Sequence, residues 1–233
     1  MKIVSNTKLI KRNKKIGQTL TIGALIVLAI GLYYSFTQPE QITITFGALL
    51  FGFLMTQIGI YFGNRWGRSP RSDELLTSGL KGLEDKYTLY HYITDIPHAL
   101  IGPAGLLALI PISVGGTIIY DDNKNRFRQK GGNLYLKIFG QEGLGRPELD
   151  AQYTINDFEK YLKKKFPDLE LPEVQAILVF TNPKARLETN GSPIPALPLE
   201  KLKDFIRKRG KEKPAPISLI QTIQKSLPED DLV

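Results

Sequence analysis

This 233-residue chain has 23 Asp or Glu that could do acid–base or metal chemistry, but it has few of the other side chains that metal sites commonly use. Cys is absent, which excludes disulfides and thiolate metal sites. The chain has only two histidines, too few for a zinc site built mainly from histidine. One of them, His98, lies in the most informative segment, Asp95 to Gly116, where proline, glycine and aliphatic residues predominate. This composition favours a packed structural element over a catalytic one.

The other polar candidates also fit ordinary structural roles. Glu74 directly follows Ser72-Asp73, and together these residues are typical of a helix start, where acids are favoured by the helix dipole. His98 fits a hydrogen-bonded structural histidine better than a ligand. Gly115-Gly116 is not followed by the residues of a phosphate-binding loop, so nucleotide binding is not expected. The sequence therefore predicts no cofactor.

The strongest basic cluster outside the N-terminal region lies at the end of a predicted helix, Leu199–Arg209. Its members are Arg207, Lys208, Arg209, Lys211 and Lys213. Three interpretations of this cluster stay open: a solvated helix end, a contact with a membrane surface, and a contact with nucleic acid. It is the candidate binding site of the chain.

The net charge of +8 is concentrated near the N-terminus. Residues 1–71 contain nine Lys or Arg and one acid, Glu40, whereas residues 72–233 contain 22 bases and 22 acids. The basic excess therefore accompanies two apolar segments and not the remainder of the chain. That distribution favours orientation in a bilayer and contact with anionic lipid over binding of nucleic acid.

Two uncharged segments are long enough to cross a membrane as helices. They are Ile16–Phe36 and Ile42–Phe62, each about 20 residues, the length that spans a hydrocarbon core of roughly 30 Å. Only Thr37–Gln41 separates them, so the helices must be antiparallel neighbours. No small-residue cleavage site is evident and a second span follows at once, which favours a transmembrane hairpin over a signal sequence. Neither segment has an ionisable residue deep inside, so a transport role is not expected.

Positive residues flank this hairpin on one side only. Six Lys or Arg precede the first segment, Arg65, Arg68 and Arg71 follow the second, and the loop between the segments has none. The positive-inside rule then predicts a protein of the inner (plasma) membrane with two helices and both termini in the cytoplasm. The predicted regions are a basic N-terminus (1–15), the hairpin (16–62), a linker (63–71), a cytoplasmic domain (72–209) and a tail with a short helix (210–233).

The cytoplasmic part alternates predicted helices and strands. Helices are expected from Ser72 to about Asp85 and over Pro147–Phe166, Leu199–Arg209 and Ile217–Ser226. Strands are expected at Tyr87–Thr94, His98–Ile101, Leu106–Ile110, Thr117–Tyr120, Asn133–Ile138, Val174–Thr181, Ala185–Thr189 and Ile194–Leu197. Asn190-Gly191 is a hairpin signal between the last two strands. The prediction is an α+β or α/β domain with a mixed sheet of about five or six strands.

Four features follow one another between Ser72 and Arg209. They are an acid-bearing first helix (Asp73-Glu74), the hairpin segment Ile96–Gly105, the next strand and turn (Leu106–Gly116), and a closing strand and helix (Val179–Pro183, Ile194-Pro195 and Leu199). In this order and spacing they resemble the nuclease-related domain (NERD) family, a branch of the restriction-endonuclease-like fold. The resemblance covers most of the cytoplasmic part.

The resemblance implies a metal-dependent nuclease site, most of whose side chains are replaced in this chain. In the family an Asp precedes the His and a Glu-x-Lys pair lies on the next strand. The carboxylates hold a divalent metal, and the Lys positions or activates the attacking water. Here Pro97 occupies the Asp position, and Ile110 and Ile112 occupy the Glu and Lys positions. Glu74 matches the helix acid, and His98 matches the His.

A weak metal site could still be rebuilt from the remaining acids. Asp95 lies two residues before Pro97, so the two would share one face of a regular strand. Asp95 and Glu74 alone make a poor Mg²⁺ site, because hard cations want several oxygen ligands. The former cleft would instead be apolar through Ile110 and Ile112, which suits filling by the protein's own side chains or docking of a hydrophobic partner.

The sequence therefore favours a membrane-anchored, non-catalytic nuclease-fold module, a pseudo-enzyme that binds protein as an accessory or scaffold subunit of a membrane assembly. Its expected partners are the bilayer and integral membrane proteins. The alternative is a membrane-tethered nucleic-acid-binding protein or weak Mg²⁺-dependent nuclease, which the fold resemblance and the basic cluster favour. Only in that alternative would Mg²⁺ be a cofactor.

Overall fold

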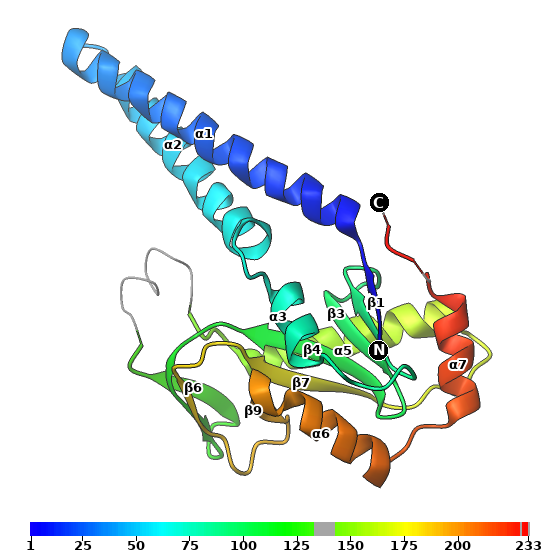
Figure 1. The fold of residues 1–233 in the computed structure, drawn as a ribbon. Coiled ribbons are helices and arrows are strands. Elements are labelled where there is room, and N and C mark those ends of the chain that lie inside the picture. Colours follow the sequence, from blue (N-terminus) through cyan, green and yellow to red (C-terminus); the bar gives the residue numbers. More distant parts are fainter. Residues whose placement is uncertain (133–142, 229, 233) are drawn as a thin grey trace. The chain divides into compact units, whose positions relative to one another are not determined.

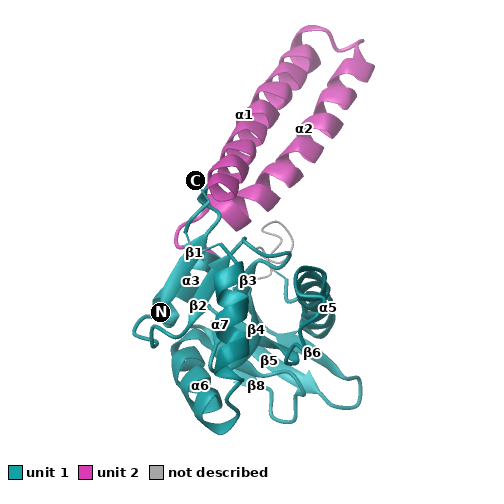
Figure 2. Cartoon of the chain, turned by 90° about the vertical axis from the view of Figure 1, so that its right-hand side faces the viewer, with its two compact units in different colours: residues 1–7, 72–233 teal, residues 8–71 magenta. Residues whose placement is uncertain are grey.

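The structure is a computed structural model that describes residues 1–132, 143–228 and 230–232. The chain divides into two compact units, which Figure 1 and Figure 2 show. We call Lys8–Arg71 the hairpin unit, and Met1–Thr7 together with Ser72–Val233 the sheet unit. The hairpin unit is thus an insertion in the sheet unit, because the chain enters it from, and returns to, the same folded part.

The hairpin unit consists of helix α1 (Thr7–Thr37), helix α2 (Ile42–Phe62) and a π-helical turn, η1 (Gly63–Gly67). Helix α1 begins before the predicted span because the lysine- and arginine-rich stretch in front of Ile16 continues the same helix. Both helices are long and apolar enough to cross a membrane, which confirms that part of the prediction. Their large apolar side chains point outward, as a lipid-facing surface requires; Leu25 is 64% exposed.

Small residues allow α1 and α2 to approach closely. A Cβ added to Gly31 would lie 2.7 Å from the Cβ of Ala48, and a Cβ added to Gly52 would lie 2.7 Å from the side chain of Leu28. Gly47, in contrast, faces open space. Glycine is therefore needed at the first two positions by close helix packing, which is common between membrane helices.

The sheet unit is built on a six-stranded mixed sheet with the order β1-β2-β3-β4-β7-β9. Its strands are β1 (Lys2–Ser5), β2 (Thr88–His91), β3 (His98–Gly102), β4 (Gly105–Ile112), β7 (Val174–Phe180) and β9 (Ala196–Pro198). Strands β2, β3 and β4 are antiparallel, whereas β1 pairs with β2, and β7 with β4 and β9, in parallel. A tight turn joins β3 to β4, and Gly105 takes a φ of 103° there, which favours glycine.

A second sheet has three strands in the order β6-β5-β8. They are β5 (Gly116–Asp121), β6 (Arg126–Lys130) and β8 (Ala185–Glu188). The sequence did not predict β6, whose alternating cations hide its strand pattern. The predicted hairpin at Asn190-Gly191 is wrong, because β8 pairs with β5 while β9 pairs with β7 in the other sheet. The predicted strand Asn133–Ile138 lies outside the described residues.

Helices cover both faces of the six-stranded sheet (Figure 1). They are α3 (Ser72–Gly79) and α6 (Leu199–Glu212) on one face, and α5 (Pro147–Lys165) and α7 (Ile217–Ser226) on the other. Alternate residues of β4 enter two separate cores: Leu107 and Leu109 pack with α3 and α6, whereas Leu106 and Ala108 pack with α5 and α7. Together with the two apolar helices, this arrangement confirms the predicted α+β class with a mixed sheet.

Both ends of the chain belong to the sheet unit, which corrects the predicted N-terminal and C-terminal regions. Val4 of β1 is fully buried in the core beside α5 and α7. Ile220 and Ile223 of α7 are buried in the same core, and the backbone N–H of Leu232 donates to the Ser5 carbonyl at 3.0 Å. A four-residue strand with polar neighbours has too little local pattern to be distinguished from a basic tail.

Candidate functional site: a buried histidine pair

The two histidines of the chain face each other across strands β2 and β3. His91 ends β2, His98 begins β3, and the two are register partners. They are 1% and 2% exposed, and their Nδ1 atoms lie 2.9 Å apart. Because side chains alternate along a strand, they share a face with Leu89 and Leu100, which pack with α3 and α6. The pair therefore lies on the α3 side of the sheet.

Helix α3 supplies a polar cover for this pair. The Thr77 hydroxyl lies 3.0 Å from Nε2 of His91. Asp73, which is 5% exposed, precedes Thr77 by one helical turn and so lies on the same side of the helix. The helix ends at Gly79, where a Cβ would lie 2.5 Å from Leu199 of α6. This close approach packs the end of α3 against the start of α6, while Thr77 reaches the histidines.

The loop between β2 and β3 adds a strained residue beside the pair. Tyr92 takes a φ of 58°, in the left-handed region that bulky residues seldom adopt. Its backbone N–H donates to the Pro97 carbonyl at 2.8 Å, and its ring centroid lies 5.1 Å from that of His98. Such strain costs on the order of 1–3 kcal/mol and is found both in tight loops and at functional sites.

The geometry of the pair allows one proton between the two rings. At 2.9 Å one Nδ1 donates and the other accepts, so the two cannot both carry a proton there. The Thr77 hydroxyl donates to or accepts from Nε2 of His91 according to the tautomer. In this arrangement the pair holds at most one positive charge. The hydrogen bond to Thr77 joins α3 to the sheet, and burial keeps both rings from solvent.

The structure separates the residues predicted to line the former catalytic cleft. Glu74 lies on α3, on the histidine side of the sheet. Ile110 and Ile112 lie on the opposite face of β4, where they pack against the core formed with the three-stranded sheet. Both isoleucines are partly buried there, on the face of the sheet away from Glu74.

Asp95 does not lie on a strand, which corrects the predicted strand face shared with Pro97. Strand β3 begins only at His98, and residues 92–97 form bends in which Asp95 is exposed. A proline cannot donate to a strand ladder, which fits a strand that starts after Pro97. Burial raises the pKa of Tyr161 on α5, and the charge of Asp95 raises it further. Asp95 is therefore near α5 rather than near Glu74.

The Mg²⁺ implied by the family resemblance does not fit these residues. Glu74 lies on the helix above the histidines, and Asp95 is exposed in the loop that precedes β3. Within residues 1–132, 143–228 and 230–232, no group of three or more His, Asp or Glu is arranged to hold a metal ion. A divalent cation would lack the several oxygen ligands that it requires.

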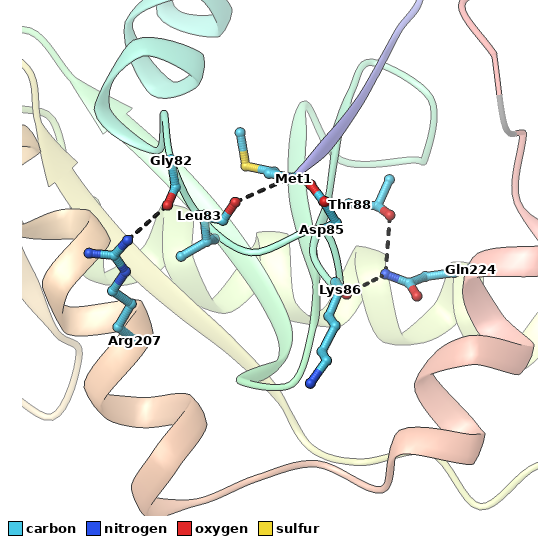
Figure 3. A network of polar contacts seen from close by, with 8 residues as sticks. All are labelled: Met1, Gly82, Leu83, Asp85, Lys86, Thr88, Arg207 and Gln224. Atoms are coloured by element: carbon cyan, nitrogen blue, oxygen red, sulfur yellow. Dashed lines mark hydrogen bonds and ion pairs between the residues drawn. The ribbon is translucent and has the colours of Figure 1, made fainter.

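Two arginines of the basic cluster have structural roles. Arg207 Nη2 donates to the Gly82 carbonyl at 2.8 Å, as Figure 3 shows. Arg209 Nε donates to the Ala104 carbonyl at 3.0 Å. These bonds tie α6 to the turn after α3 and to the β3–β4 turn, so the two guanidinium groups already satisfy backbone acceptors.

The three lysines of the basic cluster are exposed. Lys208 forms an ion pair with Glu212, one helical turn away, at 3.7 Å. Lys211 and Lys213 lie at the end of α6. An exposed pair of this kind contributes little to stability. The lysines therefore fit a solvated helix end, and they are also the members that could reach an anionic partner.

Two neighbouring cavities beside α7 lie apart from every predicted site residue. They measure about 350 and 300 Å³, and both are lined by Asp85, Gln221 and Gln224. Gln224 Nε2 donates to the Thr88 hydroxyl and to the Lys86 carbonyl, each at 3.1 Å (Figure 3). The amide of Gln224 thereby joins α7 to the start of β2.

Sequence reasoning missed His91, because its neighbours Tyr90 and Tyr92 point to ordinary strand packing. A signal was present: the only two histidines of the chain lie seven residues apart, near the facing ends of two successive predicted strands. An antiparallel pairing with a short connection brings two such residues together. Only the register, which the structure supplies, makes them direct partners.

No protein-family model matches the chain, no curated protein is significantly similar to it, and no solved structure matches it. The resemblance to the NERD family therefore rests on the four sequence features alone.

Proposed function

We propose that this chain is a membrane-anchored, non-catalytic nuclease-fold module that binds protein as an accessory or scaffold subunit of a membrane assembly. The observation that carries the proposal is that Ile110 and Ile112 are partly buried and pack against a core. At the positions where the resemblance requires a metal-binding acid and a catalytic lysine, the chain has side chains that fill space.

The position of the hairpin within the fold supports a scaffold role. The hairpin unit is inserted between β1 and α3, so the sheet unit is joined to it at two points of the chain. Only Asn6 lies between β1 and α1. A domain joined in this way is held at the membrane, which suits a subunit that positions a partner.

Helix α5 offers a surface for such a partner. Leu149 and Tyr153 lie one turn apart on α5 and are 36% and 62% exposed. Large apolar side chains that share an exposed helix face are typical of contacts between proteins. In our proposal the sheet unit lies in the cytoplasm at the inner membrane, in accordance with the basic flanks of the hairpin.

The alternative function is nucleic-acid binding or weak Mg²⁺-dependent cleavage. The exposed Lys208, Lys211 and Lys213 favour it. The hydrogen bonds of Arg207 and Arg209 to backbone carbonyls count against it, because they leave fewer cations for phosphate contacts. We therefore prefer the protein-binding function.

The test is purification of the full-length protein from its native membrane in mild detergent, followed by mass spectrometry. We expect integral membrane proteins in fixed stoichiometry that survive a high-salt wash, because apolar contacts resist screening. The double variant Leu149→Ser/Tyr153→Ser should lose them. The double variant Gln152→Ser/Asn156→Ser changes two exposed polar neighbours on α5, which bond to each other at 3.1 Å, and should retain them.

A protein that purifies alone, or with salt-labile nucleic acid only, would contradict the proposed function and favour the alternative. In that case nucleic-acid affinity should fall steeply with salt and with Lys208→Gln, Lys211→Gln and Lys213→Gln.

A further inference from the structure

One end of the hairpin unit carries eight cations and no acid. Five are within residues 8–15 of α1, and three, Arg65, Arg68 and Arg71, follow α2. The two groups lie at the same end, because a Cβ added to Gly17 would lie 2.9 Å from the Cβ of Phe62. The connection at the other end, residues 37–41, carries one acid and no cation.

The five cations of residues 8–15 lie on the part of α1 that a bilayer core does not need. Helix α1 has 31 residues. At 1.5 Å per residue it is about 46 Å long, compared with about 30 Å for the hydrocarbon core. The excess of about 16 Å is roughly ten residues at this rise, which matches the length of the basic stretch. A spanning α1 therefore continues through the head-group layer as a basic helix.

These five cations are accessible and have no counter-charge among the residues that the structure describes. They are Lys8, Lys11, Arg12, Lys14 and Lys15, and all are exposed. None of them forms an ion pair with a residue that the structure describes. A helix that concentrates this much unbalanced charge favours a negatively charged surface beside it.

Aromatic rings mark the membrane interface at the same end. The ring of Trp66 lies 5.2 Å from that of Phe62 and 6.1 Å from that of Tyr61. The Arg65 guanidinium lies 4.9 Å from the centroid of the Trp66 ring. Trp and Tyr are favoured at the head-group level of a bilayer. Trp66 is the only Trp of the chain, so tryptophan fluorescence reports only on the surroundings of this end of the hairpin unit.

We propose that the basic start of α1 is a binding surface for the head groups of anionic phospholipids, located in the monolayer that contains Trp66. The inference rests on the proposed membrane anchoring and adds the lipid class that the anchor selects. Lipid is the expected occupant rather than nucleic acid, because the cations continue directly into the apolar span and so lie within reach of the head groups whatever the placement of the sheet unit.

The test uses the full-length protein in vesicles of phosphatidylcholine with phosphatidylglycerol, in which one lipid at a time is brominated to quench Trp66 fluorescence. We expect brominated phosphatidylglycerol to be enriched at Trp66 by about fivefold, the preference expected when each lipid head group contacts one cation, which contributes about 1 kcal/mol. Neutralisation of Lys8, Lys11, Arg12, Lys14 and Lys15 to Gln should reduce the enrichment to the part that Arg65, Arg68 and Arg71 supply. A matched variant with Lys124, Lys160, Lys164, Lys184 and Lys201 changed to Gln loses the same charge from the sheet unit and should retain it.

Equal quenching by both lipids in the wild-type protein would overturn the inference, and so would enrichment that is as large in the first variant as in the wild type. Trp66 is 7% exposed, so quenching by neither lipid would mean that no lipid packs against this end of the hairpin unit, which contradicts the membrane anchoring itself. A further outcome would also overturn the inference: a DNA duplex that binds the protein in vesicles of phosphatidylcholine alone, and no longer binds the first variant. That result would assign the surface to nucleic acid.

Discussion

Val4 tests whether the first seven residues are part of the sheet unit. Its side chain is fully buried, whereas that of its neighbour Ile3 is 42% exposed. The backbone N–H of Lys2 donates to the carbonyl of Tyr87, just before β2, and that of Asn6 donates to the carbonyl of His91, at the end of β2, each at 2.9 Å. These bonds hold β1 in place. Val4 enters the core with α5 and α7 only if this pairing forms.

The substitution Val4→Ala removes two carbon groups from the core. At about 0.8 kcal/mol for each buried group, the transfer loss is about 1.6 kcal/mol, and the cavity adds to it. We expect the free energy of unfolding to fall by about 2 kcal/mol. With a urea dependence of about 2 kcal/mol per M, the midpoint should fall by about 1 M. Ile3→Ala should change the free energy by less than about 0.5 kcal/mol.

Pulse proteolysis of the full-length protein in detergent, over a series of urea concentrations, measures these midpoints. The sheet unit is detected as the protected fragment. If Val4→Ala and Ile3→Ala have equal, small effects, residues 1–7 do not pack into the sheet unit and the reasoning is refuted. Deletion of residues 2–6 with no change in the midpoint would refute it as well.

Three further predictions follow from the site and the hairpin. His98→Leu should lower the free energy of unfolding by about 1–3 kcal/mol, measured in the same urea series, because the buried Nδ1 of His91 loses its partner. Gly31→Ala should cost about 1–3 kcal/mol by forcing α1 and α2 apart, and Gly47→Ala, which faces open space, should cost nothing; thermal unfolding followed by helical circular dichroism compares them. The raised pKa of Tyr161 favours its protonated form in the folded state, so its contribution to stability is present below the ordinary value of 10.0 and is lost as the pH rises through the folded value. Asp95→Asn should reduce that shift without abolishing it, because burial is the larger cause, and alkaline titration of tyrosinate absorbance against Tyr161→Phe measures the change.

Segments with strong local signals could be predicted from the sequence almost to the residue. Helix α5 begins at the predicted Pro147, whose missing N–H suits a first helical turn, and its last turn carries three lysines. Strand β7 is a short apolar run because it is buried on both faces in the centre of the sheet. Helix α7 has the predicted bounds, Ile217–Ser226, set by a proline before it and an apolar stripe.

Features that depend on pairing between distant segments could not be predicted in this way. Strand β1 has four residues and gains its structure from β2, more than 80 residues away. The predicted helix from Ser72 to about Asp85 ends early at Gly79 and is followed by a turn in which Gly82 takes a φ of 82°. The histidine pair can be found only when the register of β2 and β3 is known. The separation of Glu74 from Ile110 can be found only when it is known which face of the sheet each residue lies on. Local patterns carry none of this information.

The central claim, that the nuclease-like part is non-catalytic, is tested most directly by a cleavage assay. The purified full-length protein is incubated with DNA and with RNA in the presence of Mg²⁺ or Mn²⁺. We predict no cleavage above that of a mock purification, because Ile110 and Ile112 stand where the resemblance to the NERD family requires the acid and the lysine. Metal-dependent cleavage that disappears in Glu74→Ala and in Asp95→Ala would contradict the account.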